Sequence, residues 1–358
     1  MTRSSSPVLI MAGGTGGHIF PGLAVADCLR AQGVPVVWLG ARGGMETDVV
    51  PAQRIELHAV AVGGLRGKGL KTRLLAPLML LRALLASLAV LRKVKPRSVL
   101  SMGGYVAGPG GLAAWLLRRP LLVHEQNSVA GFTNRKLAGL ARRVLAGFAN
   151  ALPQAEWVGN PVRESISALP PPAQRMAEQR GRQRLLVLGG SLGARALNLM
   201  LPPALALLDP ARRPQVLHQC GSRGLQEARD AYARAGVEAD VVAFIDDMAD
   251  AYGAADLAVC RAGALTLAEL SAAGLGAVLV PFPHAVDDHQ TSNSEVLAAV
   301  GAAVVVQERD LDVRELAQRL QSLLDDRGVL LRMAEAARTL AKPDAAQAIA
   351  RACLEVAA

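Results

Sequence analysis

Two stretches of the 358-residue chain decide the fold that we predict, and they follow one pattern. Residues 7–33 read PVLIMAGGTGGHIFPGLAVADCLRAQG, and residues 184–208 read RLLVLGGSLGARALNLMLPPALALL. In each stretch an apolar run of strand length ends in a glycine-rich turn, and a segment of helical period follows it. A doubly wound parallel sheet begins in this way, so two such openings predict two α/β domains.

Further apolar runs, separated by segments of helical period, supply the remaining strands of each predicted sheet. These runs lie at residues 34–39, 98–102, 120–123 and 143–146 in the first half, and at residues 215–219, 239–244, 257–260, 277–280 and 303–306 in the second. Proline residues between 160 and 173 interrupt regular structure and indicate the linker. We therefore predict domains at residues 1–160 and 161–342, with a final helix in residues 343–358.

The composition favours an intracellular α/β protein with an anionic partner. Hydrophobic residues make up 51% and aromatic residues only 3% of the chain, which suits helices packed on buried parallel strands. The four cysteines stand far apart and predict neither a disulfide framework nor a zinc site. Residues 1–160 carry 19 Lys and Arg against 6 Asp and Glu, a balance of +13, whereas the remainder carries 20 against 24, a balance of −4. Such asymmetry indicates a membrane surface or a nucleic acid as partner of the first half.

The segment from Leu65 to Arg97 favours the membrane. Leucines crowd its centre, and lysines and arginines precede and follow them. A helix that is apolar almost all round and bracketed by cations suits an anionic bilayer surface, although one face of it must pack on the protein. Because Pro77 and Arg82 interrupt the apolar run, we predict no transmembrane segment. A nucleic-acid interface is the weaker alternative, since no aromatic stacking groups accompany the cations.

The first glycine turn, Gly13-Gly14-Thr15-Gly16-Gly17-His18, offers backbone N–H groups at the start of a helix, where anions bind. It lacks the third glycine of a dinucleotide fingerprint and the lysine of a P-loop, so neither of those sites is predicted. A purely structural turn is the alternative. His18 at the mouth of the turn could accept a proton, or it could be a bystander.

Three segments of the second half could contact a phosphorylated ligand. The turn at residues 189–195 offers its backbone and the Ser191 hydroxyl. In CRAGALTLAE, residues 260–269, a helix start and Thr266 could bind a phosphate while Glu269, one turn on, could accept hydrogen bonds from a ribose diol. The alternative there is a capping box, with Thr266 as the cap and Glu269 bonding back to the backbone.

The third segment, residues 281–293, places His289, Gln290 and Asn293 on one helix face, where they could bind sugar hydroxyls. A metal site at Asp287, Asp288 and His289 lacks clean ligand spacing, and we predict no metal. Asp310 and Asp312 are better explained as a cap for the helix that follows. Polar residues also follow two strands of the first half, at residues 101–105 and 124–127, where they should face the ligand crevice.

Seven motifs occur together in this order: GGTGGHIFP, SMGGYV, HEQN, GNPVR, GGSLGARALN, CRAGALTLAEL and DDHQTSN. In this combination, over nearly the whole chain, the sequence resembles the MurG family of peptidoglycan glycosyltransferases. The resemblance implies a GT-B fold, with two Rossmann-like domains facing a cleft and a final helix that packs on the first domain. It implies inverting transfer of N-acetylglucosamine from UDP-N-acetylglucosamine to the muramoyl 4-hydroxyl of lipid I, which forms lipid II, with no cofactor and no DxD–metal site. It also implies a peripheral enzyme at the cytoplasmic face of the bacterial membrane.

The resemblance assigns the donor to the second domain, where the backbone of Ile245 would read uracil and Glu269 would hold the ribose. Ser191 and the helix start would take the diphosphate, Gln290 and Asn293 the sugar, and Arg163 the nucleotide. The helix start comprises Ala264, Leu265, Thr266, Leu267 and Ala268. From the first domain Thr15, Gly16, Gly17 and Asn127 would close on the donor sugar or the acceptor.

The chemistry implied is direct displacement at the anomeric carbon, which needs a base for the attacking hydroxyl and positive dipoles for the leaving diphosphate. The helix start at Ala264 can supply the dipoles. For the base we favour His18 and keep Glu125 as the alternative. A transferase for another lipid acceptor and a non-catalytic binding module are the other functions considered.

Overall fold

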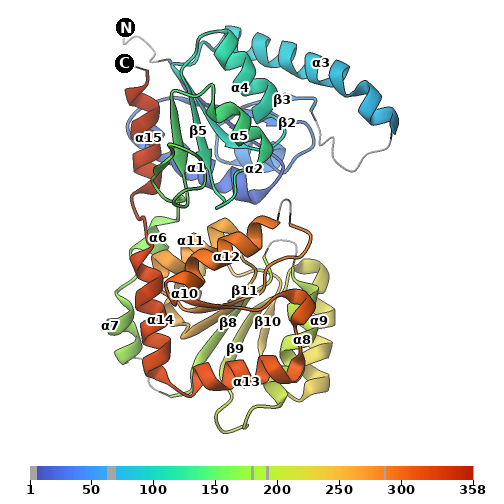
Figure 1. Ribbon diagram of the computed structural model, residues 1–358, viewed down its shortest axis with the longest axis vertical. Coiled ribbons are helices and arrows are strands. Elements are labelled where there is room, and N and C mark those ends of the chain that lie inside the picture. The colour runs from blue at the N-terminus through green and yellow to red at the C-terminus, as the bar shows by residue number, and fades with distance from the viewer. Residues whose placement is uncertain (1–5, 63–69, 179–180, 191–192, 286–287, 358) are drawn as a thin grey trace. The chain divides into compact units, whose positions relative to one another are not determined.

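The computed structural model describes residues 6–62, 70–178, 181–190, 193–285 and 288–357, and for residues 70–74 and 178 only the backbone. It forms two compact units (Figure 1). Unit 1 comprises Met1–Pro161 and Asp344–Ala358, and unit 2 comprises Val162–Pro343. Both are α/β units built on parallel sheets, so the predicted fold class is confirmed.

Unit 1 contains a seven-stranded parallel sheet in the order β3-β2-β1-β4-β5-β6-β7. Its strands are β1 (Val8–Ala12), β2 (Val36–Ala41), β3 (Glu56–Val60), β4 (Ser98–Gly103), β5 (Leu121–Glu125), β6 (Arg143–Ala146) and β7 (Glu156–Trp157). Its helices are α1 (Gly16–Ala31), α2 (Glu46–Ala52), α3 (Leu70–Val94), α4 (Ala107–Leu116), α5 (Phe132–Ala138) and α15 (Ala345–Glu355). The sequence prediction missed β3, which mixes polar and apolar residues, and β7, which has two residues.

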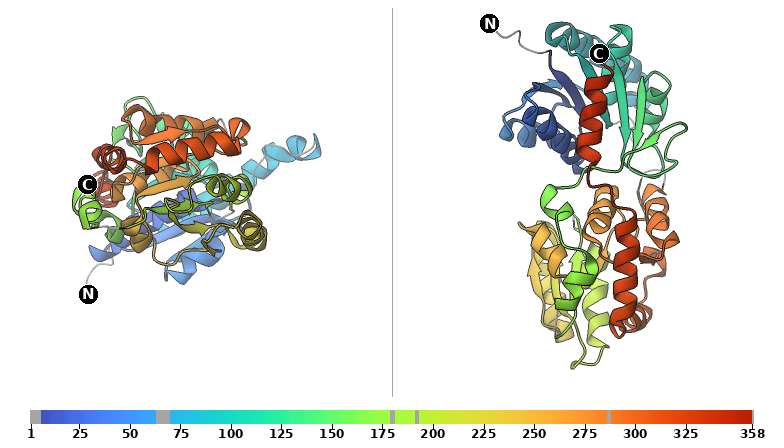
Figure 2. Two further views of the ribbon diagram at one scale, coloured as in Figure 1. Left: turned by 90° about the horizontal axis from the view of Figure 1, so that it is seen from below. Right: turned by 90° about the vertical axis from the view of Figure 1, so that its left-hand side faces the viewer.

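The C-terminal helix α15 belongs to unit 1, although unit 2 separates it in sequence from the rest of that unit (Figure 2). It packs on α1 and β4 and buries Ile349 and Cys353 in the same apolar cluster as β1. Its backbone is also tied to the sheet, because the Ser98 hydroxyl donates to the Cys353 carbonyl over 2.7 Å. Burial of each such apolar side chain stabilises the unit by about 1.5–3 kcal/mol.

Unit 2 contains a six-stranded parallel sheet in the order β10-β9-β8-β11-β12-β13. Its strands are β8 (Arg184–Leu188), β9 (Gln215–Gln219), β10 (Asp240–Val242), β11 (Leu257–Cys260), β12 (Ala277–Leu279) and β13 (Ala303–Val305). Its helices are α6 (Glu164–Ser167), α7 (Pro172–Glu178), α8 (Arg195–Ala206), α9 (Leu225–Ala235), α10 (Met248–Ala254), α11 (Ala264–Ala273), α12 (His289–Ala299), α13 (Val313–Leu324) and α14 (Arg327–Thr339).

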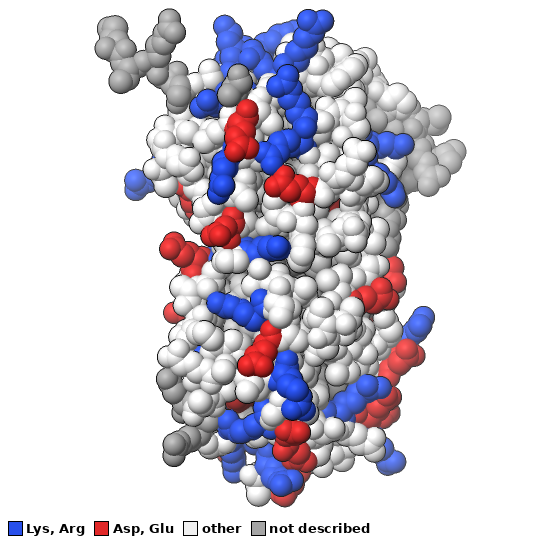
Figure 3. Space-filling model, turned by 60° about the vertical axis from the view of Figure 1, so that its left-hand side comes forward, with Lys and Arg blue, Asp and Glu red and all other residues white. Residues whose placement is uncertain are grey.

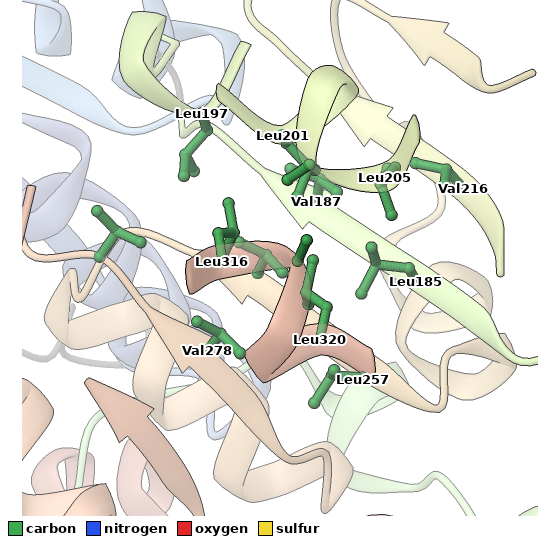
Figure 4. Packing of buried hydrophobic residues seen from close by; sticks show 14 of the residues in the cluster. Leu185, Val187, Leu197, Leu201, Leu205, Val216, Leu257, Val278, Leu316 and Leu320 are labelled. Atoms are coloured by element: carbon green, nitrogen blue, oxygen red, sulfur yellow. The ribbon is translucent and has the colours of Figure 1, made fainter. Parts of the chain in front are cut away.

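The core of unit 2 lies between the sheet and its helices (Figure 4). Leu197, Leu201 and Leu205 of α8 project from one face of the helix at intervals of four residues, and Leu316 and Leu320 of α13 do the same. They meet strand residues of β8, β11 and β12 that are themselves fully buried. Asp312 caps α13 by accepting hydrogen bonds from the backbone of residues 314 and 315, which confirms the predicted cap.

One buried arginine of unit 2 connects α7 to two other helices. The Arg175 guanidinium donates to the carbonyls of Tyr252 and Gly253 near the end of α10, and to those of Ala273 and Gly274 at the end of α11. These carbonyls have no partner within their helices, and a cation there complements both helix dipoles. Burial lowers the pKa of Arg175 from its usual value, but the carbonyls compensate for the lost hydration. Arg175 therefore holds the ends of α10 and α11 together.

In both sheets the strand order reverses between two neighbouring strands, β1 and β4 in unit 1 and β8 and β11 in unit 2. Loops that leave the carboxyl ends of such strands diverge to opposite faces, and ligands bind in the space that they leave. The glycine turns that follow β1 and β8, and the helix that follows β11, all begin at these points. The topology thus places the predicted ligand-binding segments at the expected edge of each sheet.

Candidate active site

A buried carboxylate holds the glycine turn after β1. Glu46, which is fully buried, accepts hydrogen bonds from the backbone N–H of Ala41 over 2.8 Å and of Gly14 over 3.2 Å. A side chain at Gly13 would collide with this carboxylate, and Gly14 has a φ of +92°, so both positions require glycine. Hydrogen bonds within the protein therefore set the conformation of this turn.

The residues that follow the turn begin α1. Thr15 occupies the N-cap position without a hydrogen bond from its side chain to the helix, so its hydroxyl does not cap the backbone. Gly16 and Gly17 form the first turn, where backbone N–H groups lack helical partners. These three predicted residues thus present N–H and hydroxyl groups at the carboxyl edge of the sheet.

His18 lies in the same first turn and is partly buried. Its Nδ1 is 2.9 Å from Oε1 of Gln126, which follows β5. The ring also packs on the end of β4, because a Cβ added at Gly103 would lie 3.1 Å from it. The structure therefore brings together His18 and the ends of β4 and β5, which the sequence predicted to face the ligand crevice.

Glu125, the alternative base, is 2% exposed and is surrounded by donors. Its carboxylate accepts hydrogen bonds from the backbone and side chain of Asn127, from the backbone of Gly131 and from the side chain of Asn134. Donors from the protein engage both oxygens of this carboxylate, so Glu125 holds the loop after β5 in place. Of the two candidates, His18 has the more favourable position.

In unit 2, α11 begins directly after β11, with Gly263 as its N-cap. Thr266 lies inside the helix, so the capping-box interpretation is wrong. The N–H groups of Ala264, Leu265 and Thr266 are those that a helix leaves without partners. Leu267 is less suited to binding a phosphate, because its side chain is in the core and its N–H donates to the Gly263 carbonyl.

Glu269 lies one turn into α11 and is held by two donors. The Tyr252 hydroxyl donates to its Oε2 over 3.0 Å, and Nη2 of Arg163 donates to its Oε1 over 3.0 Å. Burial, together with the charge of Glu269, raises the pKa of Tyr252 well above its usual value, so the phenol stays protonated and remains a donor. The predicted residues Arg163 and Glu269 are therefore in contact, next to the helix start.

The residues predicted to contact the sugar have structural partners of their own. Gln290 accepts a hydrogen bond from the backbone of Phe282 over 2.9 Å. Asn293 is fully buried and donates to the Ala262 carbonyl over 3.2 Å, which supports the turn before α11. Ile245 lies in the loop after β10 and is partly buried.

Two predictions involve residues outside the described part of the chain, namely Ser191 in the second glycine turn and Asp287 in the metal alternative. The described part of that turn is braced by Gln219, whose amide exchanges hydrogen bonds with both backbone groups of Gly190. Among the described residues, no group of three or more His, Cys, Asp or Glu side chains is arranged to hold a metal ion.

Sequence reasoning missed Glu46, Gln126 as a partner of His18, and Tyr252. Gln126 was detectable in principle, because it follows a strand that neighbours β4 in the sheet. Glu46 and Tyr252 gave no comparable signal, since their partners lie in other elements of the fold.

The α3 helix carries an exposed apolar surface. Ala83, Ser87 and Leu91 face the protein at intervals of four residues, while more than half of the Leu75, Leu81 and Leu85 surfaces is exposed. Its segment Leu75–Val94 is, by length and composition alone, long and apolar enough to cross a membrane, which we did not predict from the sequence. A helix that packs one face on its own domain and exposes leucines on the other is suited to attachment to a bilayer surface.

Exposed cations follow this apolar surface at the C-terminal end of α3. Arg92, Lys93 and Lys95 follow the exposed part of α3, and Arg118 follows α4, whose Trp115 is half exposed. Figure 3 shows Lys and Arg side chains gathered at the upper end of the view, over unit 1, whereas both signs of charge are mixed over unit 2. The cations of the predicted segment at residues 65–74 are not described.

Comparison with known proteins identifies the family. The glycosyltransferase family 28 N-terminal domain matches residues 8–146, and the family 28 C-terminal domain matches residues 184–349. A protein of Alkalilimnicola ehrlichii is 59% identical over 351 residues, covering 98% of both chains. A protein of Burkholderia thailandensis is 54% identical over 361 residues, covering 100% of this chain and 98% of the relative. Both are named UDP-N-acetylglucosamine–N-acetylmuramyl-(pentapeptide) pyrophosphoryl-undecaprenol N-acetylglucosamine transferase.

Solved structures agree with this result. The crystal structure of Acinetobacter baumannii MurG matches with a TM-score of 0.87 and 41% identity, over 98% of this chain and 99% of that one. A UDP-GlcNAc 2-epimerase from Neisseria meningitidis has a TM-score of 0.67 at 12% identity, which reflects the fold alone. The chain is therefore a glycosyltransferase that belongs to family 28 and, within it, to the MurG family.

Proposed function

We propose that the chain transfers N-acetylglucosamine from UDP-N-acetylglucosamine to the 4-hydroxyl of the muramoyl sugar of lipid I, forming lipid II with inversion at the anomeric carbon. The full-length similarity to relatives named for this reaction supports the proposal. The observation that carries it is the arrangement around α11, where unpaired N–H groups lie one turn from a carboxylate held by Tyr252 and Arg163. That combination suits a nucleoside diphosphate, because N–H groups bind the phosphates and the carboxylate accepts from the ribose hydroxyls.

Unit 2 is accordingly the donor-binding domain. The backbone of Ala264, Leu265 and Thr266 takes the diphosphate together with Ser191, and stabilises the negative charge that develops as UDP leaves. Glu269 holds the ribose and Arg163 another part of the nucleotide. Ile245 binds uracil through its backbone, and Gln290 contacts the sugar. Asn293 is fully buried and acts through the turn before α11 that it supports, and Ala268 continues that helix. No metal or cofactor enters this scheme.

Unit 1 is the acceptor-binding domain and supplies the base. The oxygen of the muramoyl 4-hydroxyl attacks the anomeric carbon, the bond from that carbon to the diphosphate breaks, and His18 takes the proton of the hydroxyl. Thr15, Gly16, Gly17 and Asn127 line the same edge of the sheet and contact the donor sugar or the acceptor.

We further propose that α3 and the neighbouring end of α4 attach the enzyme peripherally to the cytoplasmic face of the bacterial membrane. The exposed leucines would enter the boundary between headgroups and acyl chains, and the adjacent cations would bind anionic headgroups. This attachment suits an acceptor that carries an undecaprenyl chain. We favour a membrane over a nucleic acid as the partner, because the exposed apolar surface of α3 consists of leucines rather than of stacking aromatic residues.

The reaction is tested by measuring UDP release with and without a water-soluble lipid I analogue. We expect release from UDP-N-acetylglucosamine only when the analogue is present, little release from UDP-glucose, and none with an analogue that lacks the muramoyl 4-hydroxyl. Release that proceeds with a diacylglycerol but not with the analogue would instead favour a transferase for another lipid acceptor.

The ribose contact is tested by Glu269→Gln and Tyr252→Phe. The first removes a charged acceptor, and we expect the KM for UDP-N-acetylglucosamine to rise about 10- to 100-fold with a smaller change in kcat. The second leaves the carboxylate less well oriented, and a rise of a few-fold is expected. Tyr232→Phe removes another buried hydroxyl of unit 2 and should leave the KM unchanged. A UDP-N-acetylglucosamine analogue that lacks the ribose 2′-hydroxyl provides a further comparison. The wild type should bind this analogue more weakly than the normal donor, and Glu269→Gln should lose most of that difference in KM. An undiminished difference in Glu269→Gln would contradict the assignment.

Membrane attachment is tested with the double variant Leu81→Glu, Leu85→Glu. Because two exposed apolar side chains become charged, we expect binding to vesicles that contain phosphatidylglycerol to fall about ten-fold or more. UDP release with a soluble acceptor should be unaffected. Leu207→Glu, at an equally exposed leucine of unit 2, is the control. Equal binding by the double variant and the control would exclude α3 as the attachment surface.

A further inference from the structure

The protonation of a buried histidine, His124 in β5, can be derived from its surroundings. Its Nε2 lies 2.9 Å from the Gly159 carbonyl, which can only accept a hydrogen bond, so Nε2 carries a proton. The side chain is fully buried, and burial lowers its pKa to about 4, so the ring is neutral at physiological pH. A neutral imidazole has one ring proton, and Nδ1 of His124 is therefore an acceptor.

The amide nitrogen of Gln126 donates hydrogen bonds to His124. Its Nε2 lies 3.0 Å from Nδ1 of His124 and 3.1 Å from the His124 carbonyl, and both of these atoms are acceptors. The reversed amide would bring its oxygen against the carbonyl oxygen, so only one orientation is stable. The Gln126 backbone is held as well, because the side chain of Asn160 donates to its carbonyl over 2.9 Å. The amide oxygen Oε1 must consequently point toward His18.

The tautomer of His18 follows from the same reasoning. Oε1 of Gln126 can only accept, and it lies 2.9 Å from Nδ1 of His18, so Nδ1 carries the proton. In a neutral ring Nε2 then has the free lone pair. Among the described residues, Gln126 is the one hydrogen-bond partner of the His18 side chain, which leaves Nε2 available to a ligand.

We propose that Gln126 and His124 are positioning residues that fix the tautomer of His18, so that its Nε2 is the atom that takes the proton of the acceptor hydroxyl. The inference rests on the proposed role of His18 as base, and it adds which groups determine the ring nitrogen that carries the proton. This series of hydrogen bonds begins at the backbone carbonyl of Gly159, which can only accept a hydrogen bond. Each subsequent side chain therefore has one stable orientation.

The tautomer of His18 matters for catalysis, because the tautomer with its proton on Nε2 cannot accept a proton at Nε2. A proton on Nε2 would occupy the position of the lone pair, and the ring would have to exchange its proton before it could act. A rotation of the imidazole by 180° would place a ring carbon against Oε1 of Gln126 and break this hydrogen bond. Pre-setting the tautomer removes this step from the reaction.

The direct test is a long-range ¹H–¹⁵N correlation spectrum of the unliganded protein labelled with ¹⁵N-histidine, recorded at about pH 8, above the ordinary histidine pKa of about 6.5. The chain has six histidines, and the His18→Gln variant assigns the signals of His18. We expect a protonated Nδ1 in His18 and a protonated Nε2 in His124. A wild-type spectrum with the His18 proton on Nε2 would overturn the proposal without the need for any variant of Gln126.

The second test is Gln126→Met, which removes both hydrogen-bonding groups of the amide at similar length. We expect His18 to populate the other tautomer, and kcat to fall about 10- to 100-fold, within the contribution of a general base. The KM for the donor should stay within about two-fold, because Gln126 acts through His18. Gln53→Met, at an exposed glutamine of the same unit, should change neither quantity. An unchanged tautomer and kcat in Gln126→Met would refute the positioning role.

The two proposals fail differently. A near-normal kcat in His18→Gln would overturn the assignment of the base, and the positioning role with it, whatever the tautomers are. Conversely, an inactive His18→Gln with the wrong wild-type tautomer would leave the base in place and remove only the inference about Gln126 and His124.

Discussion

The constraint on which both units depend is the reversal of strand order in a parallel sheet. At β1 and β4, and again at β8 and β11, neighbouring strands send their chains to opposite faces, which leaves helix starts at the carboxyl edge. A helix start carries unpaired N–H groups whatever its sequence, so the fold supplies an anion-binding surface before any side chain is chosen. Around α11 this surface lies beside a carboxylate, and around α1 it lies beside an imidazole. The same architecture can thus serve a nucleoside diphosphate in one unit and proton transfer in the other.

Buried polar groups then give each site its precision. Glu46 fixes the first glycine turn, Glu125 fixes the loop after β5, and Arg175 fixes the ends of two helices of unit 2. The partners given above for Glu46 and Arg175 are backbone groups, as are two of the four donors to Glu125, and the donor or acceptor character of a backbone group cannot change. Gln126 acts in the same way on a functional side chain. The His124 backbone carbonyl sets the orientation of its amide, and the amide oxygen in turn faces Nδ1 of His18. Removing one partner of such a network leaves an unsatisfied buried group, which costs about 1–3 kcal/mol.

Much of this fold was predictable because it depends on local pattern. Apolar runs between segments of helical period predicted the strands at residues 143–146, 215–219 and 257–260 with the bounds that the structure has. The carboxyl-edge rule selected the segments around His18 and Glu269 without knowledge of their contacts. What could not be predicted is contact between distant residues. Tyr252 meets Glu269 from another helix, and nothing in a 17-residue separation indicates this. For the same reason a capping box at Thr266 was plausible from its spacing and is excluded only by the observed start of α11.

The central claim is that the helix start at α11, rather than the one at α1, holds the diphosphate of the donor. A crystal structure with UDP-N-acetylglucosamine bound tests it most directly. The account predicts phosphate oxygens within hydrogen-bonding distance of the N–H groups of Ala264, Leu265 and Thr266, with the ribose hydroxyls on Glu269. A diphosphate bound instead to the N–H groups of Gly16 and Gly17, with Glu269 free of the nucleotide, would contradict it.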